Sequence, residues 1–183
     1  DLAVFWVLWR VTGVLEEALF RGALFRSFAE ALEGAGTYRP RRVAAAASAA
    51  IFGILHVSGA AAPPADAVSL VQLAGKPVQA ALFGVIMAGV YAQSGNLWLA
   101  VGAHAAFHAL SELPSFATSG LLVETYVTGS PADLAVLLGT LALFAPPAPV
   151  AAPGLARAGP RPRPPPHPFP PPPPPPSPLL PPP

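Results

Sequence analysis

Two adjacent carboxylates and a guanidinium lie inside one apolar run near the start of the chain. Glu16 and Glu17 are followed one helical turn later by Arg21, within LAVFWVLWRVTGVLEEALFRGALFRSF. A charged side chain at the centre of a membrane helix costs about 2.5–3.5 kcal/mol. Even after Glu17 pairs with Arg21 at i,i+4, the three charges together cost on the order of several kcal/mol. We therefore expect the chain to use these groups.

Three histidines lie in two further apolar segments. His56 ends the sequence FGILH, whereas His104 and His108 are one turn apart in HAAFH and so project from one helix face. A single histidine in an apolar helix is more often a hydrogen-bonded packing residue. Three of them, together with the glutamate pair and the arginine, favour a shared polar site. The candidate catalytic residues are Glu16, Glu17, Arg21, His56, His104 and His108.

Two hydrolytic mechanisms fit these residue types. In the first, one glutamate is a general base that activates water, and histidines orient the water or donate to an oxyanion. Arg21 would then hold the second carboxylate. In the second, a divalent metal such as zinc binds the nucleophilic water. The ligands of that metal would be Glu16, His56, His104 and His108. The chain has no cysteine, and its serines have no evident base nearby.

The composition indicates a membrane protein. Hydrophobic residues make up 53% of the chain and charged residues only 10%, whereas soluble domains carry about 25% charged residues. Ten lysines and arginines are scattered over 183 residues, so we expect no nucleic-acid partner. We expect an integral protein of the plasma membrane, in contact with membrane lipid. Because the chain begins at Asp1 without an initiator Met, we also expect further spans upstream of it.

Five apolar stretches are separated by segments that contain glycine and proline. They cover residues 2–28, 43–57, 77–93, 97–110 and 134–144. Backbone groups in lipid must be hydrogen-bonded internally, and no strand-like alternation is visible, so each stretch is predicted to be a helix. We predict an all-α fold, a polytopic transmembrane bundle with about five spans. Residues 65–75 are predicted to form a short interfacial helix on the membrane.

The arginines outside the first stretch indicate an orientation. Arg39, Arg41 and Arg42 lie between the first two stretches, and three more arginines follow the last one. Alternating five spans places both basic segments on one side, which the positive-inside rule makes cytoplasmic. Lys76 falls on the opposite side and does not fit this pattern.

The end of the chain has a different composition. Residues 146–183 hold most of the 27 prolines and cannot form a packed core, so we predict a disordered or polyproline II tail. We interpret it as a passive low-complexity segment rather than a ligand for a proline-binding domain. The chain thus divides into a membrane-embedded core at residues 1–145 and a proline-rich tail at residues 146–183.

Three motifs in order resemble the CAAX prenyl protease and bacteriocin-processing family, also called CPBP or Abi. They are EExxxR at Glu16, Glu17 and Arg21, FxxxH at Phe52 and His56, and a later histidine with a polar residue four positions on, His104 and His108. The resemblance covers roughly residues 10–112. The family usually has asparagine at the last position, where this chain has His108. Histidine is the better zinc ligand, so this departure favours a metal slightly.

The resemblance implies a helical membrane endopeptidase with several spans. Eukaryotic members remove the last three residues of prenylated CAAX proteins, and bacterial members are linked to bacteriocin maturation and self-immunity. The implied partner is a peptide or protein substrate, lipidated or not. The implied roles are Glu16 as base, His104 as its helper in activating water, and His56 as a support for the oxyanion. Glu17 and Arg21 would support the site, and the family has been described both as metal-dependent and as glutamate-dependent.

Two other functions use the same residue types. A catalytically inactive immunity or scaffold protein would bind a peptide or partner in the same polar cavity. A proton-coupled transporter would use buried glutamate and histidine as a relay. The transporter is the weaker alternative, because the five predicted spans contain no visible inverted repeat.

Overall fold

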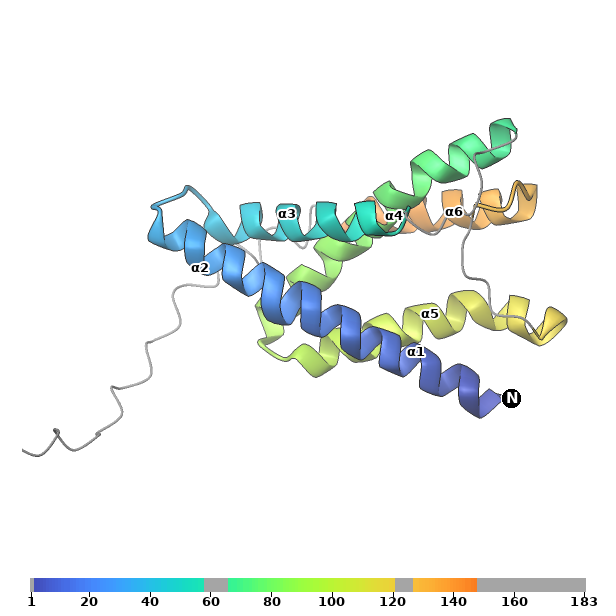
Figure 1. Ribbon diagram of the computed structural model, residues 1–183, viewed down its shortest axis with the longest axis horizontal. Helices are drawn as coiled ribbons and strands as arrows, with labels where there is room; N and C mark the ends of the chain where they lie inside the picture. The colour runs from blue at the N-terminus through green and yellow to red at the C-terminus, as the bar shows by residue number, and fades with distance from the viewer. Residues whose placement is uncertain (1, 58–65, 121–126, 148–183) are drawn as a thin grey trace, which may run out of the picture.

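The computed structural model describes residues 2–57, 66–120 and 127–147, and every element in these ranges is a helix (Figure 1). The all-α prediction is confirmed for this part of the chain. The predicted proline-rich tail lies outside the described residues, apart from its first two positions.

The first apolar stretch forms three helical elements that follow one another without a gap. These are α1 (Leu2–Glu17), the π-helix η1 (Ala18–Phe25) and α2 (Arg26–Gly34). π-Helices are rare and occur frequently at functional sites. Here the π-helix begins directly after the glutamate pair and contains Arg21. The change in helix type therefore lies at the residues that the sequence singles out.

Four further helices complete the described fold: α3 (Pro40–Leu55), α4 (Ala67–Ser94), α5 (Leu97–Ser119) and α6 (Pro131–Phe144). α3 packs against α2 and α4, α6 packs against α4, and α5 lies along α1. In Figure 1, α3 and α6 lie in the upper part of the molecule and α1 with α5 in the lower part, while α4 runs obliquely between them. The polar residues lie where these helices meet.

Two helices continue through a proline at which the sequence predicted a boundary. The prediction of a separate interfacial helix at residues 65–75 is wrong, because α4 runs from Ala67 through Pro77 to Ser94. Likewise α5 extends beyond the predicted stretch and through Pro114 to Ser119. A proline removes one N–H from the helical ladder, and the helix continues where packing on its neighbours outweighs that loss. Asp66 caps the start of α4, its Oδ1 accepting from the Ser69 amide at 2.7 Å.

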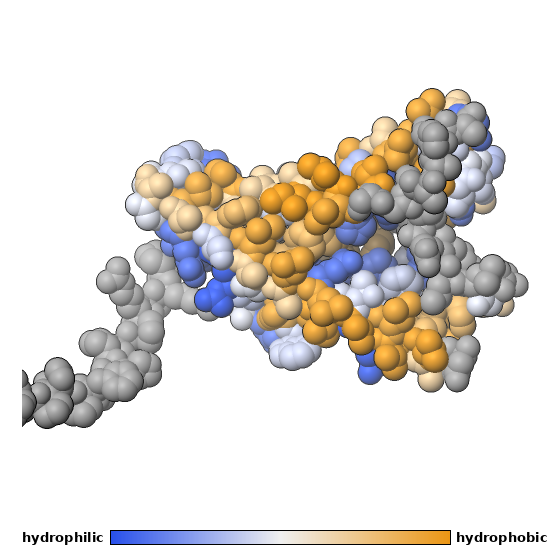
Figure 2. Space-filling model, viewed as in Figure 1, coloured by the Kyte–Doolittle hydropathy of each residue, from blue (hydrophilic) through white to orange (hydrophobic). Residues whose placement is uncertain are grey.

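One described helix, the 28-residue α4, is long and apolar enough to cross a membrane by length and composition. The other predicted spans stay predictions. Large apolar side chains are nevertheless exposed on the remaining helices. Leu15, Ile54, Leu110 and Leu143 are 64–72% exposed, and Figure 2 shows apolar residues over much of the visible surface. Extended apolar surface of this kind is typical of contact with lipid or with another protein.

Candidate active site

The site forms where the end of α1 meets the middle of α5. His104 Nδ1 lies 2.6 Å from Glu17 Oε1, and both side chains are almost completely buried. The two helices approach closely at Gly13, where an added methyl carbon would lie 3.2 Å from the Val101 carbonyl oxygen. The absence of a side chain at Gly13 therefore helps to bring the glutamate and the histidine into contact.

Arg21 binds Glu17 from the other side. Its Nη1 lies 2.9 Å from Glu17 Oε1, which confirms the predicted i,i+4 pair. Its Nη2 donates to the carbonyl oxygen of Gly84 on α4 at 3.1 Å, and its guanidinium lies 5.0 Å from the centre of the Phe52 ring on α3. Arg21 thus joins η1 to two other helices. A buried guanidinium needs a buried anion as its partner, so Glu17 is a carboxylate that accepts hydrogen bonds.

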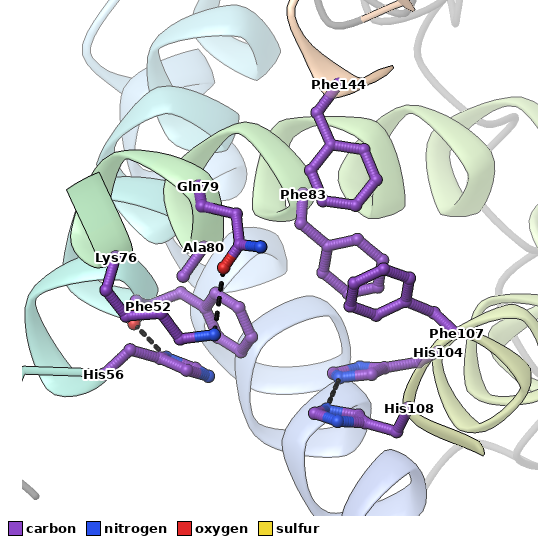
Figure 3. Close-up of a pocket in the computed structure, with 10 residues that line it drawn as sticks. All are labelled: Phe52, His56, Lys76, Gln79, Ala80, Phe83, His104, Phe107, His108 and Phe144. Carbon is purple, nitrogen blue, oxygen red and sulfur yellow. Dashed lines mark hydrogen bonds between the residues drawn. The ribbon is translucent and has the colours of Figure 1, made fainter. Parts of the chain in front are cut away.

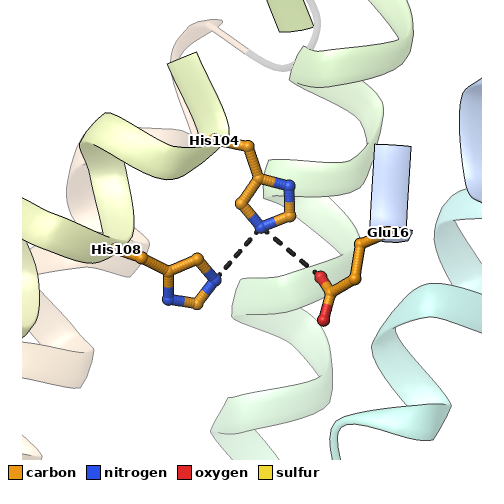
Figure 4. Close-up of side chains that lie close together, drawn as sticks. All are labelled: Glu16, His104 and His108. Carbon is orange, nitrogen blue, oxygen red and sulfur yellow. Dashed lines mark hydrogen bonds and ion pairs between the residues drawn. The ribbon is translucent and has the colours of Figure 1, made fainter. Parts of the chain in front are cut away.

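This pairing determines the tautomer of His104. Because a carboxylate only accepts, His104 Nδ1 carries the proton that it donates to Glu17. The Nε2 atom of the neutral ring then has a lone pair. It lies 3.1 Å from His108 Nε2 and 3.4 Å from Glu16 Oε2, as Figure 4 shows. His108 Nε2 therefore donates to His104 Nε2.

Glu16 differs from its neighbour Glu17 in its partners, because Glu17 Oε1 is bound by both His104 and Arg21. Each glutamate has a buried Oε2 atom without a hydrogen-bond partner within the described residues. The Oε2 atom of Glu16 faces His104 Nε2 at 3.4 Å. Two acceptors at this distance need a proton donor or a cation between or beside them. The arrangement fits a water molecule that donates one hydrogen to Glu16 Oε2 and, when His108 turns away from His104 Nε2, the other to that nitrogen, and it also fits a metal ion.

His108 is held in a stack of rings. Trp9 lies parallel to it, with 4.5 Å between ring centres and 2° between the planes, and the His104 ring lies 4.9 Å away on α5. Trp9 is not among the site residues predicted from the sequence. Trp9 lies seven residues before Glu16, and this spacing places both side chains on one face of a helix. The spacing is therefore a signal in the sequence from which Trp9 could have been predicted as a site residue.

His56 lies apart from this cluster. It caps the end of α3, and its Nδ1 donates to the Phe52 carbonyl oxygen at 2.7 Å. It lines the same pocket as His104 and His108, on the other side of the view in Figure 3. A neutral His56 therefore presents Nε2 to the pocket as an acceptor, not as a donor.

The pocket has an aromatic wall and a polar end. Four rings form the wall: Phe52, Phe83, Phe107 and Phe144. The polar lining consists of the three histidines with Lys76 and Gln79 of α4, two residues that the site prediction did not include. The cavity volume is about 20 Å³, which is enough for a water molecule but not for a peptide side chain. A larger substrate would have to widen it.

Glu16, His104 and His108 also form a group that fits a metal ion. Each offers one ligand atom, and these atoms all lie within 4.8 Å of one another. One carboxylate and two imidazoles are a donor set that zinc uses. Glu17 accepts a hydrogen bond from His104 Nδ1, the ring nitrogen that would not bind the metal. Metal-binding histidines usually donate to a carboxylate in this way, and the carboxylate orients the ring. His56, the fourth predicted ligand, is not part of this group.

A comparison with family models identifies a match over residues 1–110, to the model described as type II CAAX prenyl endopeptidase Rce1-like. The matched range includes all six candidate catalytic residues. No curated protein and no solved structure matches the chain.

Proposed function

The chain belongs to the type II CAAX prenyl endopeptidase Rce1-like family, and we propose that it hydrolyses a peptide bond in a membrane-associated substrate with water activated by Glu16 and His104. Members of this family are membrane proteases, which supports a peptidase in general. The observation that carries the proposal is the buried Glu16 Oε2, which faces His104 Nε2 at 3.4 Å.

In this mechanism Glu16 is the general base. Once the His108 Nε2 proton has turned from His104 Nε2 to the substrate oxygen, a water molecule donates one hydrogen to Glu16 Oε2 and the other to His104 Nε2, which leaves an oxygen lone pair for attack on the substrate carbonyl carbon. Glu16 takes the proton as the new C–O bond forms. It then gives that proton to the amide nitrogen as the C–N bond breaks, so that one product ends in a carboxylic acid, which keeps the second hydrogen of the water, and the other begins with an amine.

Glu17 and Arg21 act through His104. Their contacts keep the Nδ1 proton on the Glu17 side and leave Nε2 as the acceptor for water. An aspartate has the same role toward the histidine in serine protease triads. Glu17 and Arg21 are therefore positioning residues in this proposal.

His108 is the better oxyanion donor of the two remaining histidines. Its Nε2 proton can turn from His104 Nε2 to the developing oxyanion. His56 was expected to support the oxyanion, but its Nδ1 proton is committed to Phe52. His56 can donate from Nε2 only as an imidazolium or in the other tautomer.

A metal-dependent variant of the same hydrolysis is the second candidate. Glu16, His104 and His108 would hold a zinc ion, and Glu17 would orient His104 toward it. A bound zinc ion supplies a Lewis acid and a more acidic water. The close grouping of the three ligand atoms is the observation that favours this variant.

The proposed setting is a helical bundle of about five spans in the plasma membrane, with a peptide or lipidated protein as substrate. The exposed apolar side chains on α1, α3, α5 and α6 support contact with lipid on several helices. The inactive scaffold or immunity protein remains the alternative, because the same pocket could bind a peptide without cutting it.

The proposal is tested with the protein in lipid vesicles and prenylated and unprenylated peptides, with cleavage followed by mass spectrometry. We expect cleavage by the wild type and a fall of about 10²–10⁴-fold in Glu16→Gln, the usual contribution of a general base, with membrane insertion unchanged. Binding of peptide without cleavage by the wild type would favour the scaffold. Full activity of Glu16→Gln would contradict the mechanism.

A further inference from the structure

Phe144 closes one side of the pocket from the end of α6. Its side chain is buried and lines the pocket. The centre of its ring lies 5.6 Å from that of Phe83 on α4 and 5.3 Å from that of Phe107 on α5, and Figure 3 shows it above these two rings. α6 lies outside residues 1–110, the range that matches the family model. The motifs of the proposed chemistry therefore do not account for Phe144.

The rings under Phe144 adjoin the residues of the proposed chemistry. Phe83 lies 4.8 Å from the ring of His104, and Phe107 lies 5.8 Å from the ring of His108. A peptide that is attacked by water at His104 carries a side chain on each side of the cleaved bond. The apolar part of the pocket is the space next to that bond, so we expect one of these two side chains to enter it.

The pocket has no room for such a side chain while Phe144 is in place. Its volume of about 20 Å³ is enough for one water molecule. By comparison, an engineered apolar cavity of about 150 Å³ in another protein binds benzene. Displacement of the Phe144 ring would free space for a substrate side chain next to Phe83 and Phe107.

The start of α6 is fixed to α4 by hydrogen bonds. Gln72 of α4 is completely buried. Its Oε1 accepts from the amides of Thr128 and Gly129 at 3.0 and 2.9 Å, and its Nε2 donates to the carbonyl oxygen of Ser130 at 3.1 Å. These three residues directly precede α6. The helix therefore has an anchored end, and that end is the one far from Phe144 in the sequence.

The other end of α6 is held mainly by apolar contacts. Thr140, one turn before Phe144, still accepts a hydrogen bond from Gln79 of α4. Phe144 itself packs on Phe83 and Phe107. Over the described ranges, the backbone of α6 comes close to no helix other than α4. Apolar contacts are non-directional, so an apolar substrate side chain can replace the Phe144 ring without leaving a polar group unpaired.

We propose that Phe144 is a steric gate of the active site. It closes the pocket in the free protein and gives way to the substrate side chain next to the cleaved bond. This inference rests on the proposed peptidase function and adds a specificity-determining residue to it. The size of the side chain at position 144 then limits the size of the substrate side chain that the site accepts.

The test uses pairs of peptides that differ in one residue next to the cleaved bond. The bond is first located by mass spectrometry with the wild type. One pair carries alanine or tryptophan directly before the bond, and a second pair carries them directly after it. For each protein we measure the ratio of kcat/KM for the tryptophan peptide to kcat/KM for the alanine peptide. A partial loss of folded protein lowers both values and cancels in this ratio.

We expect the wild type to favour the alanine peptide in at least one pair. Phe144→Ala should raise the tryptophan-to-alanine ratio of that pair by at least about tenfold, because one methylene in an apolar pocket already changes such ratios by about 10–200-fold. Phe144→Leu should give a smaller rise. The matched control is Leu143→Ala, which truncates the neighbouring side chain of α6. Leu143 is 64% exposed, so this variant should keep the wild-type ratio.

An unchanged ratio in Phe144→Ala for both pairs would overturn the gate, because a purely structural role of Phe144 lowers the two rates together. Cleavage with unchanged ratios would contradict only this inference. If no variant cleaved any of the peptides, the peptidase function itself would be contradicted.

A second measurement tests the closure of the pocket without activity. The chain has no cysteine, so Ala80→Cys introduces a single thiol. Ala80 lines the pocket and is 4% exposed. We expect N-ethylmaleimide to label this thiol several-fold faster when Phe144→Ala is added, and at an unchanged rate when Leu143→Ala is added. Equal labelling rates in all three proteins would contradict closure of the pocket by Phe144.

Discussion

Glu17 and His104 are 87 positions apart in the sequence, and a hydrogen bond of 2.6 Å joins them. This contact separates the roles of the two adjacent glutamates. Glu17 Oε1 is engaged by His104 Nδ1 and by Arg21, whereas Glu16 Oε2 faces the other ring nitrogen of His104, Nε2, at 3.4 Å. We therefore expect Glu16 to act on the substrate and Glu17 to hold the site together.

Neutralising the two glutamates should affect stability very differently. Glu17→Gln leaves the buried Arg21 without its anion, and breaking a buried ion pair costs about 3–5 kcal/mol. Glu16→Gln removes a charge that does not form a salt bridge with Arg21, so it should lower cleavage by about 10²–10⁴-fold with little change in stability. Thermal unfolding of both variants in detergent checks this. Equal destabilisation by the two substitutions would contradict the division of roles.

Part of this site was predictable from spacing alone. The i,i+4 intervals indicated that Glu17 would meet Arg21 and that His104 and His108 would share a face. The contact between α1 and α5 was not predictable, because it depends on tertiary packing. The helix boundaries at Pro77 and Pro114 were wrong for the same reason, since packing decides whether a helix continues past a proline.

Replacing His108 by asparagine distinguishes the base mechanism from the metal mechanism. An asparagine amide can donate to an oxyanion but is a poor zinc ligand. If Glu16 is the base, we expect His108→Asn to keep activity to within about tenfold, since another donor remains. Activity is measured for both proteins with and without a chelator, and zinc binding by titration calorimetry.

The opposite pattern would identify a metal enzyme. A wild type that loses activity with chelator and regains it with zinc, together with an inactive His108→Asn, would contradict the mechanism in which Glu16 activates water without a metal. The Glu16, His104 and His108 group would then be assigned as ligands. His104→Gln is a suitable control, because it should be inactive under both mechanisms.

Trp9 should influence the rate through the orientation of His108. The two rings stack at 4.5 Å with 2° between their planes, and an aromatic pair contributes about 0.5–1.5 kcal/mol. Trp9→Leu should therefore lower kcat by about 2–10-fold with little change in KM. Trp9→Phe keeps a ring and should retain most of the rate. Equal losses in the two variants, or an effect on KM alone, would contradict an orienting role.

The close packing of α3 on α4 predicts a difference between two glycine-to-alanine substitutions. A methyl group at Gly53 would overlap the carbonyl oxygen of Pro77 and lie 3.0 Å from the Ala81 side chain, so the helices would have to separate. At Gly102, on α5, nothing lies within 4 Å of such a methyl group. Overpacking costs about 1–3 kcal/mol, whereas alanine in an open helical position is favoured over glycine by up to about 1 kcal/mol.

We therefore expect Gly53→Ala to lower the unfolding temperature and Gly102→Ala to leave it unchanged or to raise it. Gly53→Ala should also reduce cleavage, because His56, which caps α3, and Lys76 of α4 both line the pocket. Thermal unfolding in detergent and peptide cleavage are measured for both variants. A Gly53→Ala protein as stable and as active as the Gly102→Ala protein would show that α3 and α4 do not pack this closely. The pocket lining formed by these two helices would then be wrong.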